Sequence, residues 1–335
     1  MIDRTARRPR VFLVSTTDAG PIAAAVGGRM EEAADVTLWR DPGGEGQGKG
    51  PRAPGTTMAE LLRQARLHDF LVLVLGAGDL VARGGAPRET VLFEAGLLIG
   101  ALGGDRSLVA LAPGADAGSL RLPADLFDGS FAPPWLALGD GGESLAGPAA
   151  AIAERIGQCW AVAPPALLPS TGIAIGYFHN FVKPVCDYLA ADEVTIGDAQ
   201  FAGPDFDFTF DIIIPATLED ATPAGQQRFW ARNAGRLTDR SLSIGRRYPF
   251  FIRTGPTANP LRVVDYPAPL AASVDAVAMV LRREGDESED TRALLGAREI
   301  DNFETTLAAL IAADPTIAGH IRMRRLGSDS DLPLD

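Results

Sequence analysis

Glu94 lies in the stretch PRETVLFEAGLLIGALG, six residues after Arg88 and directly before a run of apolar residues. The stretch predicts a helix from Thr90 to Leu102, with Glu94 close to its start and beside surface that must be buried. A carboxylate in that place can stabilise positive charge that develops during a reaction. It can equally be an ordinary carboxylate at a helix N-terminus, held by Arg88 or by the helix dipole. The pattern alone leaves both interpretations open.

A second group of candidate residues comes from three separate segments of the other half of the chain: Tyr177, Phe181, Arg246, Arg247 and Asp265. The aromatic pair lies in a predicted helix, the adjacent arginines in a β-rich segment, and the aspartate at the end of a strand. Each also has a structural interpretation, respectively as core residues, as a solvated edge strand and as a helix N-cap.

Strand and helix patterns alternate through the first 160 residues. The predicted strands are Val11–Ser15, Val36–Trp39, Phe70–Leu75 and Ser107–Leu111. This order predicts an α/β fold, a flavodoxin-like doubly wound parallel sheet with helices on both faces. Open sheets of this kind bind ligands outside the carboxyl ends of their strands. Ser15, Thr16 and the segment 76–80, which contains Asp79, are expected at that edge.

The second half has a different composition and predicts an α+β domain. Its expected elements are helices over 171–191, 269–283 and 297–313 and strands over 208–215 and 262–265. The acidic stretch 284–290 is expected to be a solvated loop. We therefore predict domains over 9–160 and 171–325, a linker over 161–170, and a disordered tail over 326–335.

The composition excludes several classes of function. The 335 residues are 46% hydrophobic, enough for real cores, and carry a formal net charge of −12. That charge argues against binding to nucleic acid or to anionic membrane through the phosphate backbone or headgroups. Two cysteines and three histidines predict neither a disulfide framework nor a metal site. The longest apolar stretch is shorter than the roughly 20 residues of a membrane span, so we expect a cytoplasmic protein.

The region from Arg10 to about Leu111 resembles bacterial TIR-like domains of the nucleotide-binding type. The resemblance rests on VFLVSTTD, VTLW, DFLVLVLGAGDL and above all on PRETVLFEAGLLIGALG. In that family, the glutamate of the FE-x-G block is essential for cleaving NAD at the nicotinamide–ribose bond, which implies Glu94 here. Nicotinamide leaves as a neutral base, so one carboxylate that stabilises the oxocarbenium-like ribose is sufficient. The resemblance implies NAD-binding roles for the hydroxyls of Ser15 and Thr16. Asp79 and Arg88 are further candidates that could position Glu94 or bind the diphosphate of NAD. Trp39 is a candidate for a place near the nicotinamide, although a tryptophan at a strand end also has a structural interpretation as a core residue.

The region from Leu168 to Ile321 resembles the STING ligand-binding domain. The matching segments are the aromatic helix, FDIIIPATL, RRYPFF, DYPAPL and EIDNFETTLAALI, in this order. The resemblance implies a cyclic dinucleotide bound across a homodimer. Tyr177 and Phe181, on the aromatic helix, are both expected to bind the ligand, with Phe181 stacked on a base. Arg246 or Arg247 would contact phosphate or the purine edge, and Asp265 would accept hydrogen bonds from guanine.

The two resemblances together imply an enzyme that is activated by a second messenger. Cyclic di-GMP is the expected ligand, with 3′,3′-cyclic GMP–AMP as the other candidate, because a carboxylate pairs with N1–H and N2–H₂ of guanine. Ala268 stands where animal relatives have a threonine, which removes one contact to the base. The implied activity is NAD⁺ glycohydrolysis in CBASS-type antiphage defence, without a cofactor or metal and with assembly into filaments. The alternative is a non-enzymatic adaptor.

Overall fold

The computed structural model describes residues 8–15, 19–39, 58–80, 86–115, 135–138, 145–162, 168–191, 193–196, 199–202, 207–244, 246–253, 261–284 and 288–332. The chain divides into two compact units between Ala163 and Pro164, inside the predicted linker 161–170. Residues 163–167 of that linker lie outside the described residues. Each unit is therefore described by itself.

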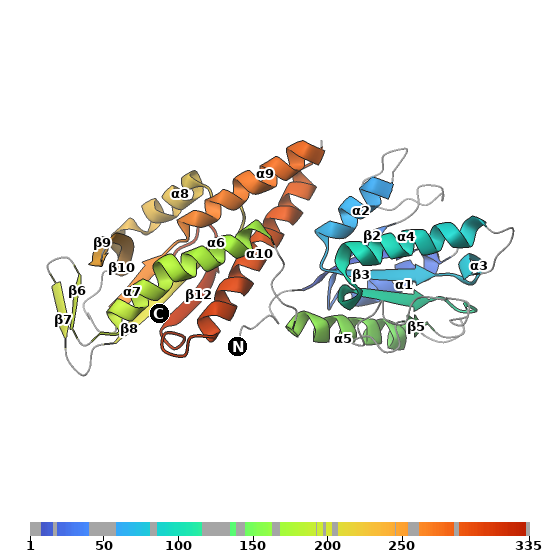
Figure 1. Cartoon of the computed structure of the whole chain (residues 1–335), viewed down its shortest axis with the longest axis horizontal. Helices are drawn as coiled ribbons and strands as arrows, with labels where there is room; N and C mark the ends of the chain where they lie inside the picture. Colours follow the sequence, from blue (N-terminus) through green and yellow to red (C-terminus); the bar gives the residue numbers. More distant parts are fainter. Residues whose placement is uncertain are drawn as a thin grey trace. The chain divides into compact units, whose positions relative to one another are not determined.

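The N-terminal unit is built on a parallel sheet with the strand order β2-β1-β3-β4-β5 (Figure 1). Its strands are β1 (Arg10–Ser15), β2 (Asp35–Trp39), β3 (Phe70–Leu75), β4 (Ser107–Leu111) and β5 (Trp135–Ala137). Every residue of β1, β3 and β4 is buried, as expected for strands covered on both faces. The order confirms the predicted flavodoxin-like topology.

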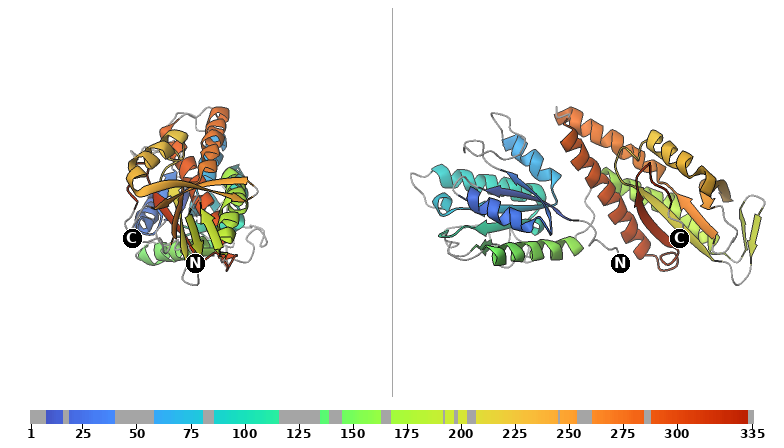
Figure 2. Two further views of the ribbon diagram at one scale, coloured as in Figure 1. Left: turned by 90° about the vertical axis from the view of Figure 1, so that its left-hand side faces the viewer. Right: turned by 180° about the vertical axis from the view of Figure 1, so that it is seen from behind.

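Helices cover both faces of this sheet, because alternate residues of each strand point to opposite sides (Figures 1 and 2). On β3, Val72 and Val74 pack with α1 (Gly20–Met30) and α5 (Ala146–Val162). Leu71, Leu73 and Leu75 pack on the other face with α2 (Met58–Leu67) and α4 (Ala86–Leu102). The short helices α3 (Ala77–Leu80) and η2 (Gly104–Arg106) complete the described elements of this unit.

A buried ion pair closes the amino edge of the same sheet. Asp69, just before β3, accepts from the backbone N–H of Arg10 at 3.0 Å, from Nε at 2.9 Å and from Nη2 at 3.2 Å. Both residues are 9% exposed. The three bonds satisfy a carboxylate that would otherwise be costly to bury, so this edge serves the fold rather than a ligand.

The C-terminal unit contains a mixed sheet with the order β12-β8-β11-β10-β9. Its strands are β8 (Phe208–Pro215), β9 (Leu237–Ile244), β10 (Arg246–Arg253), β11 (Leu261–Asp265) and β12 (Ile321–Leu326). β12, β8 and β11 are parallel, whereas β11, β10 and β9 are antiparallel neighbours. A separate antiparallel pair consists of β6 (Glu193–Ile196) and β7 (Ala199–Ala202).

The main core of this unit lies between one face of the sheet and a layer of helices (Figure 1). The helices in that layer are α6 (Pro169–Tyr177), α7 (Lys183–Leu189) and α10 (Glu289–Ala312). A smaller core on the opposite face contains Phe229 from α8 (Pro223–Asn233) and Ile213 from β8. The remaining helical elements are η6 (Ala234–Arg236), η7 (Ala268–Ala271) and α9 (Ala272–Glu284).

The predicted helix over 171–191 is interrupted by one π-helical turn, η5 (Phe178–Val182). Pro184 lacks an N–H and cannot donate to the carbonyl four residues before it. The backbone N–H of Lys183 instead bonds to the carbonyl of Phe178, five residues back. The aromatic segment therefore bulges where a regular helix is expected.

Two further predictions at element ends are wrong in part. The acidic stretch 284–290 is not all loop, because α10 begins at Glu289 behind Ser288, whose hydroxyl accepts from the backbone N–H of Thr291. Acidic residues favour that first turn through the helix dipole. The tail is also ordered as far as residue 332, where Leu332 is 2% exposed and its N–H bonds to Asn233.

Within the described residues, no helix is long and apolar enough to cross a membrane. Across the same part of the chain, no three or more His, Cys, Asp or Glu side chains are grouped so that they could hold a metal ion.

Candidate functional site

Glu94 lies in the middle of α4, not at its start as predicted. The helix begins at Ala86 because Pro87 is well suited to a first helical turn. At this distance from the N-terminus, the helix dipole no longer explains the carboxylate, since that effect is confined to the first turn. Glu94 is half-buried, and the neighbouring Ala95 and Leu98 are buried against the sheet. The carboxylate therefore lies at the margin between core and solvent.

Arg88 also lies inside α4, so its predicted position before the helix is wrong. Positions six residues apart are about 120° apart around a helix, whereas helical partners are three or four residues apart. The two positions therefore do not have the spacing of a usual helical side-chain pair. Its side chain and that of Asp79, which lies in α3, are outside the described residues, as is Thr16.

Ser15 and Trp39 end the two neighbouring strands β1 and β2. Ser15 is 7% exposed and pairs in register with Val74 of β3. The crossovers from β1 and β3 leave toward opposite sides of the sheet, so the carboxyl ends of these two strands form its topological switch point. Trp39 is half-buried, and its ring lies 5.9 Å from that of Phe12. It packs in the core cluster of α2 and α4, which agrees with the structural interpretation of this tryptophan.

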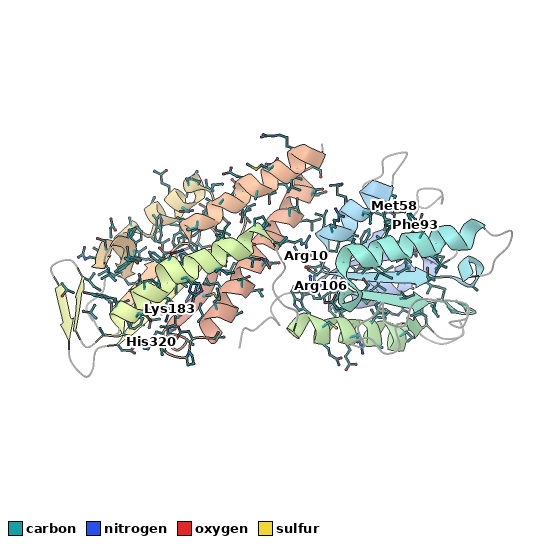
Figure 3. All side chains as sticks on the ribbon, in the orientation of Figure 1. Arg10, Met58, Phe93, Arg106, Lys183 and His320 are labelled. Atoms are coloured by element: carbon teal, nitrogen blue, oxygen red, sulfur yellow. The ribbon has the colours of Figure 1, made fainter. Side chains whose placement is uncertain are left out.

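Phe93 is a residue that the sequence reasoning missed. It precedes Glu94 on α4 and is 64% exposed, which is unusual for a phenylalanine (Figure 3). Gly96, one turn further on, is also exposed, and a methyl group added there would meet nothing within 4 Å. Among the described residues, α4 thus presents an apolar ring and a glycine to solvent close to Glu94. The FE-x-G motif contains Phe93 and Gly96, but the sequence did not show which of its residues face the solvent on α4.

In the C-terminal unit, the structure joins Tyr177 and Asp265 directly. The Tyr177 hydroxyl donates to Oδ2 of Asp265 at 2.5 Å, between residues 88 positions apart. Tyr177 is the last residue of α6, and Asp265 is the last residue of β11, next to Ile212 in register. Asp265 keeps part of its surface exposed, whereas Tyr177 is 4% exposed. Asp265 is therefore not simply a helix cap.

Phe181 lies on the π-helical turn and extends this contact into an aromatic cluster. Its ring stacks on Tyr177, with centroids 5.5 Å apart and planes 16° apart. The rings of Phe210 and Tyr248 each lie 6.2 Å from it at steeper angles. Phe181 is half-buried: it packs against the core and still keeps part of its surface accessible. Phe178, on the same turn, is 3% exposed and belongs to the core.

Arg246 and Arg247 begin β10 and pair in register with Ile244 and Ser243 of β9. The side chains of both arginines are outside the described residues, so their assignment stays a prediction. Tyr248, the next residue, was missed by sequence reasoning. It is 8% exposed and its ring contacts Phe181, which links β10 to the aromatic cluster.

Burial raises the pKa of the Asp265 carboxyl to about 6, even though hydrogen bonds from Tyr177 and from the backbone N–H of Tyr266 act to lower it. Burial and the nearby carboxylate raise the pKa of Tyr177 well above its usual range. Near neutral pH, Asp265 is thus mainly ionised and accepts hydrogen bonds, while Tyr177 keeps its proton. The arrangement combines an acceptor for a donor pair with an aromatic surface, which suits a planar base.

Comparisons with known proteins match both units. The family model described as "CAP12/Pycsar effector protein, TIR domain" matches residues 10–130. The model described as "Prokaryotic STING domain" matches residues 169–308. Both resemblances read from the sequence are thereby confirmed, together with the fold class.

Similar proteins include three relatives named CD-NTase-associated protein 12. The protein from Flavobacterium daejeonense is 31% identical over 264 residues, which cover 76% of this chain and 81% of the relative. The protein from Sphingobacterium faecium is 27% identical, and the match covers 78% of this chain and 84% of the relative. The protein from a Lachnospiraceae bacterium is 25% identical, and the match covers 92% of this chain and 95% of the relative. A solved structure, "Bacterial STING in complex with c-di-GMP", is 26% identical with a TM-score of 0.42, covering 49% of this chain and 99% of that one.

Proposed function

Because this chain belongs to the family of CD-NTase-associated protein 12, we propose that it is an NAD⁺ glycohydrolase activated by a cyclic dinucleotide in CBASS-type antiphage defence. The observation that carries the proposal is the direct joining of Tyr177, Phe181 and Asp265 in the unit that matches a prokaryotic STING domain. The other unit matches a TIR domain of effector proteins and carries Glu94 on α4. One unit supplies ligand recognition and the other the chemistry.

In the N-terminal unit, Glu94 is proposed as the catalytic residue. The half-buried carboxylate lies where water is partly excluded, which strengthens its interaction with positive charge. The C–N bond between nicotinamide and ribose breaks, nicotinamide leaves as a neutral base, and the ribose carbon becomes positively charged. Glu94 stabilises that charge until water adds to the carbon and releases a proton. Ser15 at the end of β1 is proposed to contact NAD at the switch point.

In the C-terminal unit, the proposed ligand is cyclic di-GMP. Phe181 has the accessible ring that can stack on a base, and Asp265 is the carboxylate that can pair with N1–H and N2–H₂ of guanine. Arg246 or Arg247 is proposed to bind the phosphates or the guanine edge from the start of β10. A ligand with two-fold symmetry fits two copies of the same site, so we propose a homodimer around it.

Activation is proposed to act through self-association of the N-terminal units. Ligand binding brings copies of the chain together, and open head-to-tail contacts between them form filaments. Exposed apolar surface at Phe93, beside Glu94, supports a contact at this side of α4.

The test is to incubate the purified chain with NAD and a panel of cyclic dinucleotides and to measure free nicotinamide by chromatography. The proposal requires release that depends on a guanine-containing cyclic dinucleotide. A chain that binds the ligand and assembles, yet never releases nicotinamide, would instead be a non-enzymatic adaptor.

A further inference from the structure

Tyr177 makes two contacts at once, and both involve candidate ligand-binding residues. Its hydroxyl bonds to Asp265, and its ring stacks on Phe181. With 4% of its surface exposed, Tyr177 offers no open face on which a base could stack. We propose that Tyr177 is a positioning residue that holds Asp265 and Phe181 in place, and that the choice of base depends on its hydroxyl. This inference rests on the cyclic-dinucleotide role proposed above for the same site.

The hydrogen-bond positions of Asp265 explain why the hydroxyl affects the choice of base. An ionised carboxylate offers about four lone-pair positions. The Tyr177 hydroxyl occupies one and the backbone N–H of Tyr266 occupies another. Two lone-pair positions remain, and guanine offers two donors for them, N1–H and N2–H₂. Adenine instead presents one donor group beside the N1 acceptor, which an ionised carboxylate repels.

Loss of the hydroxyl would change this balance in a defined direction. Burial already raises the pKa of Asp265, and the bond from Tyr177 opposes that rise. Without the bond, the carboxyl takes up a proton more easily and becomes a donor. A protonated carboxyl can donate to N1 of adenine and accept from its amino group, so the preference for guanine should decrease.

Other groups around the pair do not take over this titration. Burial keeps the pKa values of Cys186 on α7 and of Tyr266 above their usual range, so both keep their protons. Of these three groups, Asp265 is the one expected to change its charge near pH 6.

The experiment uses the full chain with Tyr177→Phe, which removes the hydroxyl and keeps the ring. Calorimetric titrations with cyclic di-GMP and cyclic di-AMP at about pH 8 give the ratio of the two affinities. We expect this ratio to fall about tenfold, which is the effect of losing one hydrogen bond to a charged group. The matched control is Tyr188→Phe on α7, which removes a hydroxyl whose hydrogen bonds within the described residues go to the backbone of Thr195. The control should leave the ratio unchanged.

An unchanged ratio in folded Tyr177→Phe protein would overturn the inference. If the wild-type chain binds neither ligand, the proposed function itself fails, whereas guanine preference retained in Tyr177→Phe contradicts only the role of the hydroxyl. A second measurement needs no variant. A proton shared between a tyrosine and a carboxylate gives a far-downfield proton resonance, which should persist when cyclic di-GMP binds to the wild-type chain. Its loss on binding would show that the ligand displaces Tyr177 from Asp265.

Discussion

Glu94 and Asp265 are both carboxylates at the margin of a core, but the two units place them in different ways. Glu94 is fixed by its position on α4 relative to a parallel sheet, and its motif spans a single helix. Asp265 is fixed by a direct bond to Tyr177, which comes from a segment 88 positions away. A local motif is thus sufficient to find the first residue. The role proposed for the second depends on tertiary packing, so it should be sensitive to changes in the residues that contact Asp265.

Replacing Glu94 should have the largest effect, because the proposed function assigns the chemistry to this carboxylate alone. Glu94→Gln should lower the rate of nicotinamide release at least about 10²–10³-fold, the usual loss when one group that stabilises transition-state charge is removed. Binding of cyclic dinucleotide, measured by calorimetry, should not change. Glu154→Gln on α5 is the control, since that carboxylate is exposed and, within the described residues, accepts a hydrogen bond from the side chain of Gln158. Cleavage near the wild-type rate in Glu94→Gln would remove this residue from catalysis.

Substitution of Asp69, at the amino edge of the N-terminal sheet, should lower the stability of this unit. Asp69→Ala leaves Arg10 buried without its carboxylate, which should cost about 3–5 kcal/mol of local unfolding free energy. Hydrogen exchange of the amides in β1 and β3 measures this loss. The control, Asp35→Ala, breaks the exposed pair with Arg8 and should cost at most about 1 kcal/mol. Equal costs for both variants would contradict the structural role given to the buried pair.

Replacing Asp265 should change ligand choice rather than overall binding. Asp265→Ala should weaken the binding of cyclic di-GMP by about 1–3 kcal/mol, because the guanine donors then stay unsatisfied. The binding of cyclic di-AMP should weaken less. Asp275→Ala, at an exposed position of α9, serves as the control in the same calorimetric titrations. Equal losses for both ligands in Asp265→Ala would leave no role for this carboxylate in reading guanine.

The two phenylalanines of the π-helical turn separate binding from stability. Phe181→Ala should weaken cyclic-dinucleotide binding by about 1–3 kcal/mol per base, with activity restored at higher ligand concentration. Phe178→Ala should instead lower the melting temperature, because this ring is 3% exposed in the core. If Phe181→Ala binds the cyclic dinucleotide with unchanged affinity, Phe181 is a core residue like Phe178 and does not stack on the ligand.

The sheet of the N-terminal unit was predictable because its signal is local. A buried parallel strand such as Phe70–Leu75 is a continuous apolar run, and the alternation of strands and helices sets the topology. The start of α4 was missed because Ala86 to Glu89 carry no apolar period, although Pro87 permits a first turn there. This error placed Glu94 near a helix start instead of in its middle.

The candidate site of the C-terminal unit was predictable in its members but not in its contacts. Sequence patterns singled out Tyr177, Phe181 and Asp265, yet no spacing reveals that a hydroxyl and a carboxylate 88 positions apart share a hydrogen bond. The π-helical turn was missed because Pro184 acts on hydrogen bonds, not on hydrophobic periodicity. The ordered tail was missed because its apolar residues are sparse and show no period, and the burial of Leu332 depends on distant Phe229 and Ile213.

The most direct test of the central claim is to measure NAD cleavage and ligand occupancy in the same sample of the wild-type chain. Cyclic di-GMP is added in steps, nicotinamide release is followed, and bound ligand is determined at each step. If the C-terminal unit controls chemistry at Glu94, the rate should rise with occupancy, and Phe181→Ala should follow the same curve at higher ligand concentration. Nicotinamide release that is independent of bound ligand, or absent at full occupancy, would contradict the account.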